Sequence, residues 1–223
     1  TARVAAAACG ETPLLALSTG TNNAFPVIRE ATVAGLAAGL LAVGAVDPQE
    51  AVRRATALEV RAGDRTELAL VDVCVSTARH VGARALWDPA TLTELFCTFA
   101  EPDAVGLSSV AGLVCRSPRS ERTGVAVLFA PVSTARYVVQ APIAPGLVTP
   151  VGVQAWRRLA VGEEIRITAP HGVLAVDGER EIEFDGGNTP RVRLRGDGPR
   201  CVDVPAVLAA AAARGLVRRG ASG

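Results

Sequence analysis

The sequence contains no lysine, so all 23 of its basic side chains are arginines. This absence excludes a P-loop lysine, a Schiff-base lysine and a lysine general base. Aromatic residues make up only 4% of the chain, which argues against a base-stacking surface for nucleic acid. The net charge of +1 provides no general attraction to nucleic acid or to an anionic membrane. A phosphate site in this chain would therefore use backbone N–H groups, arginine or a metal ion.

Long apolar runs are also absent. No stretch reaches the roughly 20 apolar residues that span a bilayer, and the longest candidate, residues 34–46, predicts a buried helix. The five cysteines are odd in number and none forms a C-x-x-C pair. Their number and spacing predict reduced thiols in a cytoplasmic protein. From the absence of long apolar runs we expect no membrane partner. The two histidines, His80 and His171, have no cysteine nearby, so we assign no metal-ligating residue.

An apolar run at residues 14–17 ends abruptly at residues 18–23, STGTNN. The run predicts a buried strand of a parallel sheet, and the short polar residues predict a tight loop at its carboxyl end. Ligands bind at this end of open α/β sheets, where backbone N–H groups can approach an anion closely. The residues alone predict either a phosphate-binding loop or an ordinary strand-to-helix turn.

The pattern of elements changes near residue 55. Before it, residues 1–9 and 29–43 predict helices, and Asp47-Pro48 predicts the cap of a short helical piece that ends near residue 54. After it, residues 57–61 and 66–76 predict a β-hairpin, and Asp88-Pro89 predicts a helix through residue 99. Short strands follow at residues 104–108, 124–129, 137–140, 163–168, 172–176, 181–184 and 191–194. We therefore expect an α/β domain in residues 1–55, a mostly-β domain in residues 56–204, and a C-terminal helix and tail in residues 205–223.

Residues 20–25, GTNNAF, resemble the GT-x-N-D/N-x-F signature of the NAD kinase/diacylglycerol kinase superfamily. The longer pattern of residues 18–26 and 29–32 resembles the NAD-kinase-like branch called acetoin catabolism protein X. The similarity continues, in the same order, at residues 69–72, 81–87 and 106–109. This resemblance implies the C-terminal part of a Rossmann-like nucleotide-binding α/β domain, followed by a NAD-kinase-like β-sandwich domain. It also implies an active site between these two domains.

The resemblance implies ATP and Mg²⁺ as cofactors, with NAD as a candidate acceptor. The residues that would border the nucleotide are Thr1, Thr19, Gly20, Thr21, Asn22 and Asn23. Lipid kinases of the superfamily usually carry Asp where this chain has Asn23, which favours the NAD-kinase-like branch. Alternatively, both asparagines bond only the backbone of their own loop. Thr1 would be the last residue of the family's GGDGT motif, so we expect the natural protein to extend further toward its N-terminus.

Four residues are candidates for binding the acceptor: Asp72, Arg84, Ser108 and Ser109. Asp72 lies inside an apolar strand, where a charge is costly unless it is paired or used. NAD kinases carry an Asn-Glu pair at a similar position, where this chain has Val71-Asp72. The alternative to an acceptor-binding role is that Asp72 lies on the exposed face of a half-buried strand. Arg84 could hold a phosphate. The two serines lie where NAD kinases have an acceptor loop.

Asp177 and Glu179 are the catalytic candidates. Residues 177–179 lie between two predicted strands, and Asp-Gly is a strong signal for a hairpin turn. The resemblance adds an acid/base or metal-contacting role. It implies a phosphotransferase that moves a phosphoryl group from ATP to a hydroxyl of NAD or a related small acceptor. A lipid kinase and an inactive nucleotide-binding regulator are the alternatives.

The family mechanism uses the Asp of the GGDG motif, so we expect these 223 residues alone to be inactive. The resemblance further implies that the protein self-associates through its β domain.

Overall fold

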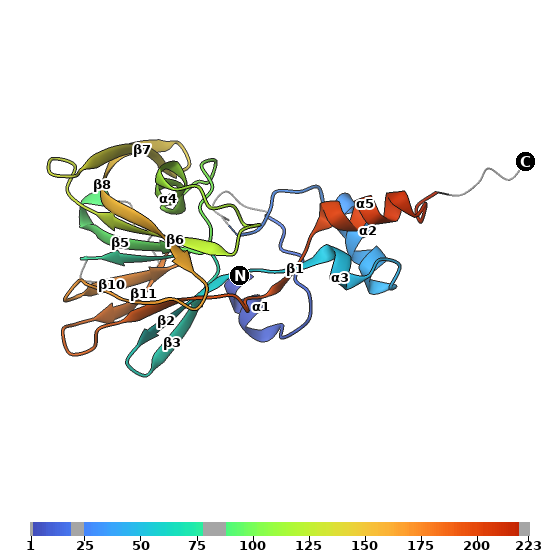
Figure 1. Ribbon diagram of the computed structural model, residues 1–223, viewed down its shortest axis with the longest axis horizontal. Helices are drawn as coiled ribbons and strands as arrows, with labels where there is room; N and C mark the ends of the chain where they lie inside the picture. Colours follow the sequence, from blue (N-terminus) through green and yellow to red (C-terminus); the bar gives the residue numbers. More distant parts are fainter. Residues whose placement is uncertain (1, 19–24, 78–87, 219–223) are drawn as a thin grey trace, which may run out of the picture. The chain divides into compact units, whose positions relative to one another are not determined.

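The computed structural model describes residues 2–18, 25–77 and 88–218, except for the side chains of residues 180 and 181 (Figure 1). The described chain divides into two compact units. One contains residues 56–198, and the other contains residues 2–55 together with the C-terminal residues from 199 onward. Within the described ranges, no helix is long and apolar enough to cross a membrane.

The smaller unit is mostly helical. Its helices are α1 (Ala2–Ala8), α2 (Ala31–Ala42), α3 (Pro48–Ala51) and α5 (Val204–Ala213). Asp47 and Asp203 cap α3 and α5 by accepting hydrogen bonds from backbone N–H groups of the first turn, and a proline begins or closely follows the start of each helix. Strands β1 (Val52–Arg54) and β13 (Arg200–Val202) pair antiparallel beside them. Small side chains of α2, α3 and α5 form the hydrophobic core of this unit.

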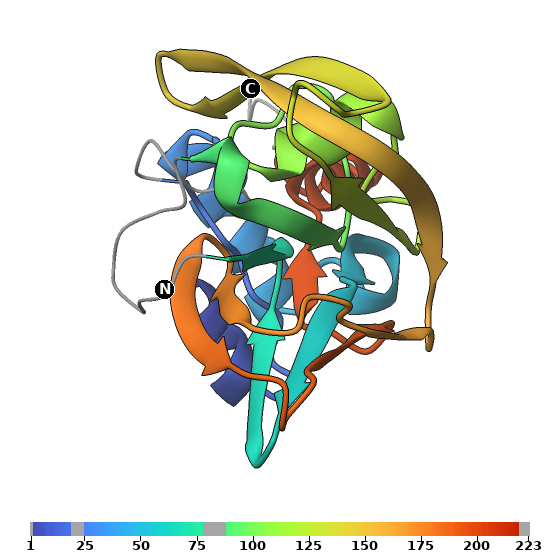
Figure 2. The same cartoon turned by 90° about the vertical axis from the view of Figure 1, so that its left-hand side faces the viewer.

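The larger unit contains two antiparallel sheets among the described residues. The first has the strand order β11-β10-β4-β5-β6-β8-β7 and the second has the order β3-β2-β12-β9. The first sheet comprises β4 (Asp72–Ser76), β5 (Leu92–Cys97), β6 (Thr123–Phe129), β7 (Tyr137–Ala144), β8 (Leu147–Ala160), β10 (Gly172–Val176) and β11 (Glu179–Phe184). The second comprises β2 (Ala57–Ala62), β3 (Arg65–Ala69), β9 (Glu164–Arg166) and β12 (Arg191–Arg195). Figure 2 shows β8 as a long curved strand, and a register shift beside β6 accompanies this curvature.

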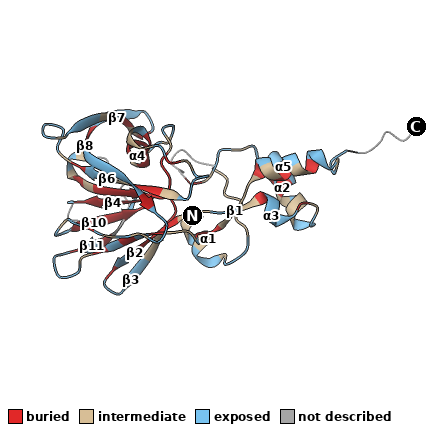
Figure 3. Ribbon diagram, viewed as in Figure 1, coloured by how far each residue is buried: buried red, intermediate tan, exposed pale blue. Residues whose placement is uncertain are grey.

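The two faces of the seven-stranded sheet have different neighbours. One face packs against the four-stranded sheet through a cluster that includes Phe96, Leu174 and Leu58. The opposite face packs against helix α4 (Ser108–Val114) through a cluster that includes Cys97 and Val110. The central strands β4 and β10 are buried along their whole length, as the colours of Figure 3 show. Successive residues of a strand therefore alternate between two packed environments.

The mixed α/β class with mostly antiparallel sheets is confirmed, and several local predictions are confirmed with it. The predicted hairpin of residues 57–76 is present as β2 and β3, although residues 72–76 belong to the other sheet. The turn between β10 and β11 contains Asp177 and Gly178, both with positive φ, as the Asp-Gly sequence predicts. Residues 31–42 and 204–213 are helical close to the predicted bounds.

Four local predictions were wrong. The predicted helix at residues 89–99 is a single turn, η1 (Pro89–Thr91), followed by β5, because the apolar residues after it pair with β4 and β6. Residues 108–114 form α4, where we expected a strand ending at residue 108 and a loop beyond it. Residues 14–17 make only isolated bridges at Leu14 and Leu17 in place of a strand. Residues 52–54 form β1, where we expected a helical end.

Candidate functional site

Asp72 begins β4 and lies opposite Cys97 of β5, on the sheet face that packs against α4. Only 7% of the residue is exposed. Within the part of the chain that the structure describes, no group donates a hydrogen bond to its carboxylate. A largely buried carboxylate without a donor is costly, because burial removes most of the water that solvates its charge.

The surroundings of Asp72 change its protonation. Burial, and secondly the negative charge of Asp177, raise the pKa of Asp72 to about 7 from an ordinary value of 3.8. The thiols of Cys74 and Cys97 lie beside it, and their pKa values are raised by burial and then by the charge of Asp72. Near neutral pH, both protonation states of Asp72 are therefore populated: the ionised carboxylate only accepts hydrogen bonds, and the protonated carboxyl can also donate one.

Asp177 holds the backbone that leads into β4. Its Oδ1 accepts hydrogen bonds from the N–H groups of Leu70 (3.0 Å), Val71 (2.8 Å) and Asp72 (3.3 Å). Its own N–H donates to the carbonyl oxygen of Asp72 at 2.9 Å. Its φ of 50° lies in the left-handed region, which Asp tolerates better than most residues. These contacts give Asp177 a structural role, while Glu179 is exposed at the start of β11.

The two serines that we expected near the acceptor begin helix α4, and both are buried. The hydroxyl of Ser109 donates to the carbonyl oxygen of Gly106 at 2.7 Å. The hydroxyl of Ser108 is buried and has no hydrogen-bond partner among the described residues. Because Val110 of the same helix and Cys97 belong to one hydrophobic cluster, α4 covers the sheet face that carries Asp72.

The structure therefore places Asp72, Asp177, Ser108 and Ser109 in one unit, and it links Asp72 directly to Asp177. The predicted nucleotide-binding residues Thr1, Thr19, Gly20, Thr21, Asn22 and Asn23 lie outside the described residues, and so does Arg84. No group of three or more His, Cys, Asp or Glu residues that could hold a metal ion occurs among the residues described.

Two buried polar residues, in β5 and directly after it, were not predicted from the sequence. Thr98 donates its hydroxyl to the carbonyl oxygen of Leu70 at 2.7 Å, which ties β5 to the segment before Asp72. Glu94 is 5% exposed and accepts hydrogen bonds from residues 168 and 169. The signal that identified Asp72, a charge inside an apolar strand, applies equally to Glu94. The wrong helix prediction for residues 89–99 concealed it.

Comparison with known proteins identifies the family. Residues 56–197 match the acetoin catabolism protein X C-terminal domain, and the chain belongs to this family. The prediction made from the sequence is thereby confirmed. The match has nearly the same bounds as the larger structural unit, residues 56–198.

Two individual proteins are similar to the chain. Acetoin catabolism protein X of Cupriavidus necator is 40% identical over 215 residues, which cover 94% of this chain and 60% of the relative. The chain thus spans about 60% of the length of the curated relative that it matches. Yeast NADH kinase, solved in complex with NADH, aligns over 96% of this chain and 62% of its own, with 14% identity and a TM-score of 0.44.

Proposed function

We propose that the whole protein is an ATP-dependent phosphotransferase that transfers a phosphoryl group to a hydroxyl of NAD or a related small acceptor. The proposal includes a Rossmann-like nucleotide-binding domain and a NAD-kinase-like β-sandwich, with ATP and Mg²⁺ as cofactors. One observation carries it: the buried carboxylate of Asp72 has no hydrogen-bond donor within the described residues. A hydroxyl-bearing acceptor would supply the missing donor.

Asp72 and Ser108 are suited to orient such an acceptor. The ionised carboxylate of Asp72 accepts a hydrogen bond from the acceptor hydroxyl, and the buried hydroxyl of Ser108 can accept or donate a second one. Burial strengthens both interactions because the local dielectric is low. Orienting the acceptor for in-line attack is the main task of a protein in phosphoryl transfer, together with stabilising charge. No group of acidic, histidine or cysteine side chains among the described residues could hold a metal ion, so the roles proposed for Asp72 and Ser108 concern the acceptor alone.

The test uses the full-length protein with its natural N-terminal residues. Wild type and Asp72→Asn are incubated with γ-labelled ATP and Mg²⁺, and with NAD, diacylglycerol or no acceptor. We expect label in NADP with the wild type, and a KM for NAD at least about tenfold higher in Asp72→Asn with little change in the KM for ATP, because one charged hydrogen bond to the acceptor is lost.

Asp64→Asn is the matched control, because it removes the same charge from an exposed turn of the same unit. It should leave both KM values unchanged. Label in the lipid would favour the lipid kinase alternative. If no acceptor is labelled, the proposed phosphotransferase is contradicted.

A second candidate, a nucleotide-binding regulator without turnover, is favoured by the contacts of Asp177. A carboxylate that already accepts three backbone hydrogen bonds is poorly available as a catalytic base. Tight binding of ATP or NAD by the full-length protein, with no labelled product, would support this candidate.

We also propose self-association through the larger unit. Strand β7 ends its sheet and, with the hairpin partner β8, exposes the apolar side chains of Tyr137, Val138 and Val148. An exposed edge strand with apolar side chains is suited to contact a second chain. Sedimentation at several protein concentrations tests this, and a monomer throughout would contradict it.

A further inference from the structure

A second candidate site lies in the larger unit, away from Asp72. It is a pocket of about 230 Å³ over strands β5, β6 and β8, beside the edge strand β9. The lining residues that matter here are Glu94, Phe96, Leu128, Ala155, Arg157 and Ile165. Apart from the two charged residues, these side chains are apolar, and their surface would favour a ligand with an apolar body.

The alternation along β5 separates this pocket from the candidate acceptor site. Glu94 and Phe96 alternate with Leu95 and Cys97, and the latter two pack toward α4 on the face that also carries Asp72. Phe96 belongs to the cluster between the two sheets. Glu94 and Phe96 therefore line a pocket on the opposite face of the seven-stranded sheet.

Hydrogen bonds to one oxygen of Glu94 hold its side chain in place, and its second oxygen receives none from the described residues. Its Oε1 accepts hydrogen bonds from the N–H of Thr168 (2.8 Å), the hydroxyl of Thr168 (2.7 Å) and the N–H of Ala169 (3.2 Å). Its Oε2 receives no hydrogen bond from any described residue. The side chain is thus preorganised by neutral donors, and a carboxylate oxygen at an apolar pocket is left for a ligand.

The other charged residue of the pocket is already paired. The guanidinium of Arg157 binds the carboxylate of Glu163. The carboxylate of Glu94, at 5% exposure, has only neutral donors around it. The uncompensated charge of the pocket is therefore negative, which selects a positively charged ligand.

We propose that this pocket binds a small amine cation, with its ammonium group donating to Oε2 of Glu94 and its apolar body against Phe96, Leu128 and Ile165. The volume is below the roughly 300–1,000 Å³ of pockets for drug-sized ligands, so the body is one ring or a short aliphatic chain. The ring of Phe96 adds an attraction for a cation. This site is independent of the proposed phosphotransferase activity.

The test compares three probes of nearly equal shape and different charge: benzylammonium, benzyl alcohol and benzoate. Binding to the full chain is measured by ligand-observed NMR. We expect benzylammonium to bind at least about tenfold more tightly than benzyl alcohol, and benzoate not to bind. Equal affinity for all three probes, or no binding of benzylammonium, would overturn the proposal.

Three variants locate the binding. Glu94→Gln keeps an Oε1 acceptor for Thr168 and Ala169 but removes the charge, so it should weaken benzylammonium at least about tenfold and leave benzyl alcohol within about twofold. Glu121→Gln removes the same charge from an exposed position and should change neither. Ala155→Leu fills the pocket without touching Glu94 and should weaken both probes. If benzylammonium binds Glu94→Gln and Ala155→Leu as tightly as wild type, the site is elsewhere and the proposal fails.

Discussion

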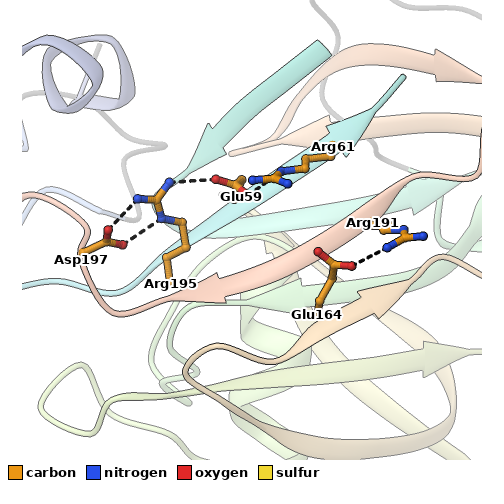
Figure 4. Close-up of polar contacts among 6 residues, drawn as sticks. All are labelled: Glu59, Arg61, Glu164, Arg191, Arg195 and Asp197. Atoms are coloured by element: carbon orange, nitrogen blue, oxygen red, sulfur yellow. Dashed lines mark hydrogen bonds and ion pairs between the residues drawn. The ribbon is translucent and has the colours of Figure 1, made fainter. Parts of the chain in front are cut away.

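Asp72 and Glu59 are equally buried, each with 7% of its surface exposed, but their surroundings are opposite. Glu59 lies on the outer face of the four-stranded sheet between Arg61, at 2.7 Å, and Arg195, at 2.8 Å (Figure 4). Arg195 also binds Asp197, and this contact, ahead of Glu59, raises the pKa of the guanidinium. Asp72 has no arginine beside it among the described residues, and the charge that acts on it is the like charge of Asp177.

The difference shows that this fold can pair a buried carboxylate where pairing serves stability. The chain has 23 arginines, and the four-stranded sheet uses several of them for this purpose, including Arg191 with Glu164 in Figure 4. The unpaired carboxylate of Asp72 lowers the stability of the folded protein, and a single substitution would remove this cost. Such local violations are expected where a residue serves a ligand.

Asp177 supports the backbone that leads to Asp72, and Asp177→Ala should have the largest effect of the variants considered. Three backbone N–H groups would lose their acceptor, and Ala disfavours the positive φ of this position. We expect the free energy of unfolding to fall by about 3–4 kcal/mol in urea denaturation. Asp177→Asn keeps an acceptor and tolerates positive φ, so its loss should be less than half as large. Equal stability of Asp177→Ala and wild type would contradict the structural role of Asp177.

The cost of burying Asp72 should depend on pH. Its pKa is about 7 in the folded protein against 3.8 for the ordinary group, so the folded state binds more protons between these values. The free energy of unfolding therefore falls as pH rises through this range, and Asp72→Asn removes the effect. We expect the stability of Asp72→Asn relative to wild type to increase by about 3 kcal/mol between pH 4 and pH 8. A pH-independent difference between the two proteins would contradict the raised pKa.

Substitution of Glu59 should lower the stability of the protein, whereas substitution of Asp72 should raise it at neutral pH. Glu59→Gln replaces two charged hydrogen bonds by weaker ones, so the free energy of unfolding should decrease by about 1–2 kcal/mol at pH 7. The value is modest because the side chains of Arg61 and Arg195 are 56% and 38% exposed and water can solvate them. Denaturation at low and at 1 M salt should show a smaller loss at high salt. A gain in stability would show that Glu59, too, is buried at a net cost.

The smallest expected difference in stability is between substitutions of paired and unpaired arginines of the four-stranded sheet. Arg61→Ala removes one ion pair of Glu59 and should destabilise by about 0.5–1 kcal/mol. Arg193→Ala removes an exposed arginine that has no ion pair within the described residues, and it should change stability by less than about 0.5 kcal/mol. Thermal unfolding of the two variants side by side checks this order.

Local chemistry made parts of the fold predictable. Asp47-Pro48 predicted a helix start, and Asp177-Gly178 predicted a hairpin turn, because caps and tight turns depend on neighbouring residues alone. Asp88-Pro89 also caps a turn, but the residues after it form β5 because their partners β4 and β6 lie far away in the sequence. Pairing between distant strands overrode the local signal there.

The candidate site was predictable to a similar extent. A lone charge in an apolar strand identified Asp72, and the structure shows it buried without a donor. The sequence does not reveal that the carboxylate of Asp177 is engaged by the backbone of residues 70–72, because a contact over about a hundred residues depends on the sheet order. For the same reason the sequence did not assign Glu94 to a pocket, which forms only where β9 lies beside the larger sheet.

The proposed function requires that Asp72 is a buried carboxylate available to bind an acceptor. The direct measurement is a ¹³C NMR titration of its side-chain carboxyl in the full-length protein, assigned with Asp72→Asn, without and with NAD. We expect a pKa near 7 for Asp72 in the free protein and a shift of its carboxyl resonance when NAD is added. A pKa near the ordinary 3.8, with a resonance that NAD does not move, would contradict this requirement.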